Sequence, residues 1–204
     1  MKTLFILVLT MIFSLFIKAQ EIGISPVKIW TSNDELKDPI GIGISLGENF
    51  WDVKFKLEYI HASNERSYYG HLINNIILYQ NSHDIENVNS SSSLNAYEIS
   101  ANFCQKLYKE YNFYSGVGVT FDEFKLKRTG INSGKITNFD NDWRRGVFFA
   151  FTFSRDQLFW QPITFEALYK IKWLSEGVYT TQIELPFEKI GTGQELQLNL
   201  VYKF

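Results

Sequence analysis

Apolar and polar residues alternate with a period of two along most of the chain beyond residue 20. Between residues 40 and 47 every second residue is Ile or Leu, and the residues between them are Gly or Ser. Similar alternation recurs in residues 53–59, 97–104, 113–121, 147–153 and 163–173. Such alternation is typical of strands with two unlike faces, and no long stretch has a convincing helical period. The pattern therefore predicts an all-β, antiparallel protein.

The clearest alternation is in the last strand. Its apolar face carries Leu196, Leu198, Leu200, Tyr202 and Phe204, opposite Gln197, Asn199 and Lys203. In a soluble β-protein such an apolar face is the core, whereas in a transmembrane barrel it contacts lipid and the polar face lines the lumen. Alternation alone does not distinguish these two arrangements.

Three further features favour the membrane barrel. The polar faces are rich in Gly, Ser, Asn and Thr near mid-strand, and a narrow eight-stranded barrel has only enough interior space for side chains. Short connections alternate with long polar ones, like periplasmic turns and external loops. Aromatic residues gather near strand ends, as in the girdles at membrane interfaces. The predicted girdle comprises Trp51, Tyr59, Tyr108, Tyr111, Trp143, Trp160 and Trp173.

Eight strands fit these connections best, in an up-and-down barrel. The expected strands are residues 21–30, 39–47, 52–62, 95–107, 111–124, 143–155, 161–174 and 194–204. Ten strands are the alternative, if residues 68–80 and 179–187 also pair, but this path reverses the expected loop lengths. The Asn- and Ser-rich stretch 87–95 is expected to be a mobile loop because it has little apolar surface.

The first 19 residues resemble a targeting signal. Lys2 is followed by an apolar run over residues 4–17 and by small Ala19 before the expected cleavage point. This run is too short for a typical transmembrane helix, and its layout is that of a secretory signal peptide. We therefore expect residues 1–19 to direct export and residues 20–204 to form the barrel.

The amino-acid composition argues against several other classes of function. The chain has 20 basic and 22 acidic residues in 204 and shows no concentrated basic patch, so nucleic-acid binding is not expected. Aromatic residues make up 17% of the chain, a share that suits strands and membrane interfaces. Cys104 is the single cysteine, so no intrachain disulfide stabilises the fold.

The signal ending at Ala19, the hairpin from Tyr97 to Phe121 and the terminal Phe204 resemble small outer-membrane β-barrel proteins. The resemblance is to the OmpX and OmpA-barrel type, in the form common among Bacteroidota. It implies location in the bacterial outer membrane, contact with outer-membrane lipid, and insertion by the barrel-insertion machinery. In that family the alternating residues from Leu196 to Phe204 act as the assembly signal.

Charged residues on the predicted inward faces form the most specific candidate site. They are Lys54, Lys56, Glu58, Glu98, Lys106, Glu166, Lys170 and Lys172. Unpaired charges are costly in a narrow lumen, so these side chains should pair across the barrel. The pairing predicts a salt-bridged plug, and the alternative is a narrow pore or ligand cavity lined by these charges.

Catalytic patterns are weak. Residues 43–47 match G-x-S-x-G, but no helix follows to form a nucleophile elbow. His61 or His71, with Ser63 or Ser67 and Glu65, would suit a lipid-modifying triad at the outer rim. His83 and the acidic residues Asp140 and Asp142 lack a metal-ligand spacing. We therefore expect neither catalysis nor a cofactor or metal. The expected function is structural, or a surface interaction through external loops, with a porin-like pore or a lipid-modifying enzyme as alternatives.

Overall fold

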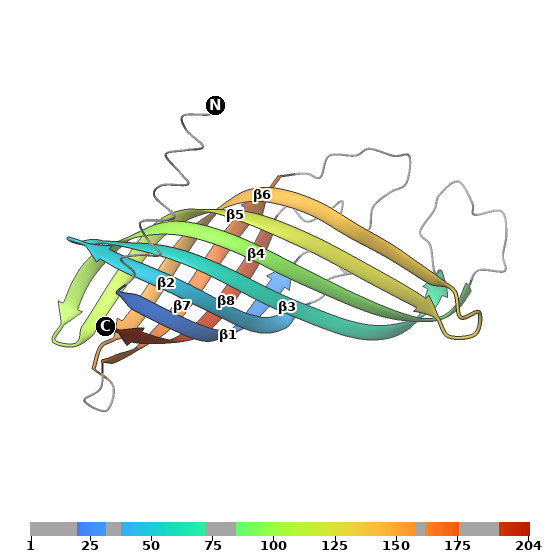
Figure 1. Ribbon diagram of the computed structural model, residues 1–204, viewed down its shortest axis with the longest axis horizontal. Helices are drawn as coiled ribbons and strands as arrows, with labels where there is room; N and C mark the ends of the chain where they lie inside the picture. Colours follow the sequence, from blue (N-terminus) through green and yellow to red (C-terminus); the bar gives the residue numbers. More distant parts are fainter. Residues whose placement is uncertain (1–19, 32–37, 72–84, 158–161, 176–191) are drawn as a thin grey trace.

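The computed structural model of this chain describes residues 20–31, 38–71, 85–157, 162–175 and 192–204, with the side chains of residues 70–71 and 139–142 left undescribed. Eight antiparallel strands form a closed barrel in sequence order (Figure 1). They are β1 (Glu21–Thr31), β2 (Ile40–Phe50), β3 (Val53–His71), β4 (Ile85–Tyr108), β5 (Tyr111–Gly130), β6 (Ile136–Arg155), β7 (Ile163–Leu174) and β8 (Thr192–Lys203). The predicted eight-stranded up-and-down barrel is confirmed. No helix among these residues is long and apolar enough to cross a membrane.

The sequence alternation sorts residues between the outside and the lumen. On β2, Ile42 and Ile44 are 57% and 52% exposed, whereas Ser45 between the outward positions is 5% exposed. On β8, Leu198 and Leu200 point outward, and Gln197 and Asn199 are buried inside. The outer wall is thus apolar and the lumen largely polar, the reverse of a soluble β-barrel core.

The strands differ in length by a factor of about two. Strands β1, β2, β7 and β8 have 11 or 12 residues, close to what a tilted strand needs to cross a bilayer. Strands β3 to β6 have 19 to 24 residues. They run past the others at one end, which we call the far end (Figure 1). We call their additional length the projecting sheet: residues 64–71, 85–92, 125–130 and 136–142.

The projecting sheet corrects several predicted boundaries. The predicted third strand ended at residue 62, but β3 continues to His71. The Ser-rich stretch 87–95 lies within β4 and is not a loop, because its backbone pairs on both sides. Ser91, for example, lies between Glu65 of β3 and Lys127 of β5. Strands β5 and β6 likewise extend the predicted hairpin to a short turn at residues 131–135.

The opposite end carries both ends of the barrel chain and the short connections, and we call it the turn end. Phe204 N donates to Gln20 O at 2.9 Å, and the chain reverses between β2 and β3 at Trp51 and Asp52. The predicted signal, residues 1–19, lies outside the described residues. So do Trp160, His83 and the segment 179–187, one of the two extra strands of the ten-stranded alternative. Of residues 68–80, the described part is the end of β3.

Candidate functional site

The lumen holds a network of buried ion pairs from five strands, β1, β3, β4, β7 and β8. Seven of the eight predicted lumen charges point into it: Lys54, Lys56, Glu58, Glu98, Glu166, Lys170 and Lys172, each at most 6% exposed. Lys106 is the exception. It is exposed near the turn end of β4, where the pairing with β5 shifts register between Lys106 and Tyr108. The strand therefore leaves the lumen before it reaches Lys106, and this part of the prediction is wrong.

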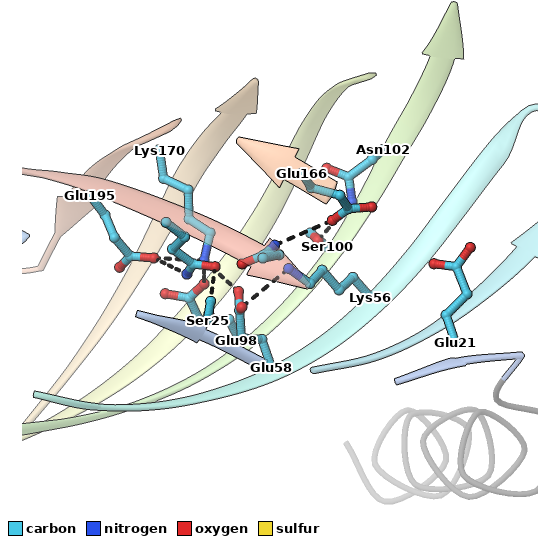
Figure 2. Close-up of polar contacts among 12 residues, drawn as sticks. Glu21, Ser25, Lys56, Glu58, Glu98, Ser100, Asn102, Glu166, Lys170 and Glu195 are labelled. Carbon is cyan, nitrogen blue, oxygen red and sulfur yellow. Dashed lines mark hydrogen bonds and ion pairs between the residues drawn. The ribbon is translucent and has the colours of Figure 1, made fainter. Parts of the chain in front are cut away.

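Lys170 lies at the centre of the network (Figure 2). Its Nζ contacts carboxylate oxygens of Glu58 at 2.5 Å, Glu98 at 2.5 Å and Glu195 at 2.8 Å. Lys172 pairs with Glu98 and with Glu195, the latter at 2.6 Å, and Lys56 pairs with Glu58 at 3.2 Å. Three lysines therefore neutralise three glutamates in a space closed to solvent.

A second cluster lies nearer the turn end. Lys54 Nζ contacts Glu21 at 2.5 Å and Glu166 at 2.6 Å. Each glutamate also accepts from an amide: Asn49 Nδ2 lies 2.8 Å from Glu21, and Asn199 Nδ2 lies 3.2 Å from Glu166. A buried ion pair is stable only when its remaining hydrogen-bonding groups are also satisfied, and these amides meet that need.

The prediction missed Glu21 and Glu195. Both follow the alternation of β1 and β8: Glu195 lies two residues before the inward Gln197, so the pattern that identified Lys170 also contained it. The glycines of β2 make room for these charges. A Cβ at Gly47 would lie 3.1 Å from Glu21 Oε2 and 3.3 Å from Lys54 Cε, closer than most side chains tolerate.

An apolar layer lies between the network and the far end. It consists of Val27, Ile29, Ile60, Ala62, Leu94, Ala96, Phe124 and Leu126, all at most 3% exposed. On β3 this layer begins at Ile60, directly after the inward Glu58. This layer was not predicted, because inward apolar residues interrupt the polar face of each strand only briefly.

The network leaves little free space. A cavity of about 10 Å³ lies beside Lys54, Lys56 and Glu166, room for about one water molecule. Oxygens of Glu58, Glu98 and Glu195 lie within 4.8 Å of one another, a spacing that a metal ion would also need. The Lys170 ammonium already lies among these three carboxylates, so the arrangement is an internal ion pair.

The outward face of the far end changes from aromatic to polar within one row of residues. Tyr59 and Tyr97 lie side by side with ring centroids 5.2 Å apart, and Trp143 stacks on Tyr97 at 6.2 Å. In the next row, Asn95 accepts from Tyr59 at 3.0 Å and donates to Glu123 at 2.8 Å. Beyond this row most outward residues of β3, β4 and β5 are polar or charged: Ser63, Glu65, Ser67, Asn89, Ser91, Ser93, Lys125, Lys127 and Thr129. Tyr69 and Ile85, at the tip of β3 and β4, are the large exposed exceptions on these strands, at 72% and 41%.

The other predicted girdle residues fall at both ends of the wall. Trp173 is 40% exposed near the far end, whereas Trp51 and Tyr108 are 90% and 67% exposed at the turn end with Tyr111. Trp30, which was not predicted, is 38% exposed near the far end.

Two of the catalytic candidates, His61 and Ser67, each lie against an asparagine side chain. His61 Nδ1 lies 2.8 Å from Asn95 Oδ1, and Ser67 Oγ donates to Asn89 at 2.6 Å. The described residues therefore provide His61 and Ser67 with amide partners, and the side chain of His71 is undescribed. Ser45, the centre of the G-x-S-x-G match, is buried in the middle of β2, where there is no strand-to-helix turn.

A carboxylate fixes the turn of the projecting sheet. Glu86, near the start of β4, accepts from the backbone N–H groups of Asn132 and Ser133 at 2.9 Å each, and from Ser133 Oγ at 2.5 Å. These donors hold the pKa of Glu86 below its usual range, the Ser133 hydroxyl most strongly. Glu86 thus connects β4 to the β5–β6 turn.

No family model matches the sequence, and no curated protein is significantly similar to it. Solved structures are similar in fold. Neisserial surface protein A is 14% identical, covers 90% of this chain and 95% of its own, and superposes with a TM-score of 0.51. A major outer membrane protein from Thermus thermophilus is 7% identical over 90% of this chain and 99% of its own, with a TM-score of 0.58. The ring of eight strands, the apolar outer wall and these superpositions agree: the fold is that of small outer-membrane β-barrel proteins.

Proposed function

We propose that this chain is a non-enzymatic outer-membrane barrel, whose lumen is closed and whose projecting sheet is presented outside the cell for surface interactions. The observation that carries the proposal is the contrast between the two halves of the molecule. The barrel is filled by ion pairs such as those of Lys170, whereas the projecting sheet extends a polar face well beyond the strands that suffice to cross a bilayer.

The apolar outer wall supports the membrane location. Soluble monomers rarely expose large continuous apolar surfaces. Here Ile42, Ile44, Leu198 and Leu200, all outward residues of β2 or β8, are 44% to 57% exposed. We further propose export by the signal in residues 1–19, insertion by machinery that reads the strand ending at Phe204, and membership of the type common among Bacteroidota.

A conducting pore is the alternative for the lumen. The three carboxylates around Lys170 and the apolar layer from Ile60 to Leu126 both argue against it, because an ion would have to displace buried charges and then cross an apolar constriction. We expect no discrete conductance steps when the folded barrel is reconstituted in a planar bilayer. Regular steps from a preparation with verified insertion would overturn the closed lumen.

Orientation can be tested with two epitope insertions. Gly134 lies in the far turn with φ +65° and nothing within 4 Å of a built Cβ, so an insertion there is tolerated sterically. We expect antibody to label it on intact cells. The matched control is an insertion between Lys109 and Glu110, in the turn at the opposite end, which should be labelled only after the outer membrane is permeabilised. The reverse pattern, or recovery in the soluble fraction, contradicts the proposal.

A further inference from the structure

The outward face of the projecting sheet carries large apolar residues at its tip. Tyr69 of β3, Ile85 of β4 and Ile136 of β6 are exposed there, and so is Ile131 in the turn between β5 and β6. Ile136 belongs to the outward face because it pairs with the outward Thr129 of β5. A belt of polar residues separates this tip from the lipid-facing wall, so the bilayer does not cover these side chains. Exposed apolar groups rimmed by polar residues mark protein–protein contacts, so the tip suits contact with a protein.

The polar belt below the tip is hollowed and carries one charge of each sign. A groove of about 560 Å³ crosses β3, β4 and β5, with Asn89 and Ser91 of β4 in its middle. Glu65 of β3 and Lys127 of β5 lie on either side of Ser91, because the register pairs Ser91 with both. Two strand spacings, roughly 10 Å, separate these two residues. Within the described part of the chain neither of them has an ion-pair partner, so both charges are available to a partner molecule.

A second copy of this chain carries the complementary charges in the required places. Two barrels in one membrane share the direction of the membrane normal, so a closed symmetric pair is related by a half-turn about that normal. Strand β4 lies between β3 and β5, so a half-turn that sets β4 against β4 exchanges the sides of β3 and β5 (Figure 1). Glu65 of each copy then faces the side that carries Lys127 in the other, and Tyr69 faces the side that carries Ile131. A copy in an opposing membrane, turned about an axis across the sheet, would instead bring Glu65 towards Glu65.

We propose that the projecting sheet docks against the same face of a second copy in the same membrane, so that two barrels stand side by side. The groove over Ser91 lies at the centre of the contact, and Glu65 and Lys127 of the two copies pair across it. The apolar tips meet above this row, where water would otherwise cover them. This inference rests on the proposed outer-membrane location and deepens the proposed function, because it names the partner of the surface interaction.

Cysteine cross-linking in intact cells tests the contact. The single cysteine of the chain, half-buried near the turn end, is first removed as Cys104→Ser. Ser91→Cys then places a thiol close to the proposed axis, where the thiols of the two copies meet, and we expect a disulfide-linked dimer on oxidation with a copper catalyst. Thr192→Cys is the matched control, because Thr192 is exposed at the far end of β8 on the other side of the barrel. This control should remain monomeric.

Charge reversal distinguishes a second copy from any other partner. Glu65→Lys sets lysines against Lys127, and Lys127→Glu sets glutamates against Glu65. Each variant alone should therefore lower the cross-linked fraction about tenfold, since two exposed pairs change from attraction to repulsion. When the two variants carry different epitope tags and are produced in the same cell, both contacts again join opposite charges. The mixed dimer should then form as readily as the unchanged dimer.

The outcomes separate this inference from the proposed function. A barrel with Ser91→Cys that stays monomeric at a normal outer-membrane level overturns the inference and leaves the proposed function standing. A cross-link to a protein of another mass also overturns it, and so does a mixed dimer that forms no better than the dimer of either charge variant. A chain that never reaches the outer membrane refutes both the inference and the proposed function.

Discussion

At the residue scale, the lumen network shows what alternation can and cannot identify. The inward lysines and glutamates follow from the period of two, because alternate residues of a strand share a face. The period does not show which lysine pairs with which glutamate, since the pairing depends on how the eight strands are staggered around the barrel. Lys170, for example, contacts Glu58, which is distant in sequence. Lys106 fits the period but lies past the end of the lumen, and a period carries no information about where the lumen stops.

The network predicts a large cost for removing one charge. Glu195→Gln leaves Lys170 and Lys172 with one fewer carboxylate in a closed space, and breaking a buried ion pair costs about 3–5 kcal/mol. We expect the free energy of unfolding to fall by that amount in urea titrations of the barrel in lipid vesicles, followed by gel migration.

Lys106→Gln is the control for this measurement. Its side chain is exposed, so the variant should unfold within about 0.5 kcal/mol of the unchanged protein. A cost below about 1 kcal/mol for Glu195→Gln would mean that the network is solvated and not sealed.

At the scale of elements, strand existence was predictable and strand ends were not. Each of the eight strands overlaps its predicted segment, because the apolar outer wall imposes a strong alternation. The projecting sheet has no such wall, so its polar stretch in residues 87–95 has the composition of a loop. It forms a strand because β3 and β5 pair with it on both sides, a tertiary effect that local composition does not contain.

The turn of the projecting sheet should depend on pH through Glu86. Its pKa is lower in the folded protein than its ordinary value of 4.5, so the carboxylate contributes stability above that value and loses it as the pH falls through the folded pKa. We expect the amides of Asn132 and Ser133 to be protected from hydrogen exchange at pH 6 and to lose protection as the pH is lowered below 4.5 through the folded pKa of Glu86, after correction for intrinsic rates.

Glu86→Gln provides the comparison for the pH effect. A neutral amide accepts these hydrogen bonds more weakly than a carboxylate does. Protection of Asn132 and Ser133 should therefore be low over this whole pH range in the variant. If the protection in the unchanged protein does not fall as the pH is lowered below 4.5, other contacts order the turn.

The projecting sheet should also be separable from the barrel. Lys127 pairs with Asn138 and Arg128 with Thr137, so deleting residues 127–128 together with 137–138 shortens one hairpin, keeps the alternation, and leaves Leu126 of the apolar layer in place. We expect normal outer-membrane recovery and heat-modifiable migration, with loss of whatever binding the intact sheet supports on whole cells. Failure of the shortened chain to assemble would show that the barrel needs the sheet in order to fold.

At the scale of the whole molecule, the chain closes on itself at the turn end. Phe204 N donates to Gln20 O, and the Phe204 ring packs edge-on against Tyr202 with centroids 5.2 Å apart. The rest of this side chain is open, with 79% of its surface exposed. Phe204 therefore contributes little packing to the folded barrel, and this exposure suits the recognition during assembly that we propose for it.

Deletion of Phe204 should accordingly affect assembly more than stability. We expect a clear fall in the fraction of chain found in the outer membrane, while the barrel refolded in detergent unfolds at nearly the same urea concentration. Asn112→Ala removes a buried polar side chain inside the lumen. This variant should lower the urea concentration of unfolding while leaving the fraction in the outer membrane nearly unchanged. Equal amounts of protein in the outer membrane with and without Phe204 would show that Phe204 is not part of an assembly signal.

The unequal strand lengths make the barrel asymmetric about the membrane normal, with a tall side and a low side. Residues 64–71 of β3 alone extend the wall by roughly 25 Å, at about 3.3 Å per residue, on the side of β3 to β6. The other side, formed by β1, β2, β7 and β8, has strands of only 11 or 12 residues. Rotation about the membrane normal therefore determines whether a neighbouring protein meets the tall wall or the low rim. In a crowded membrane, contacts between neighbouring barrels should therefore favour some rotational orientations of this molecule over others.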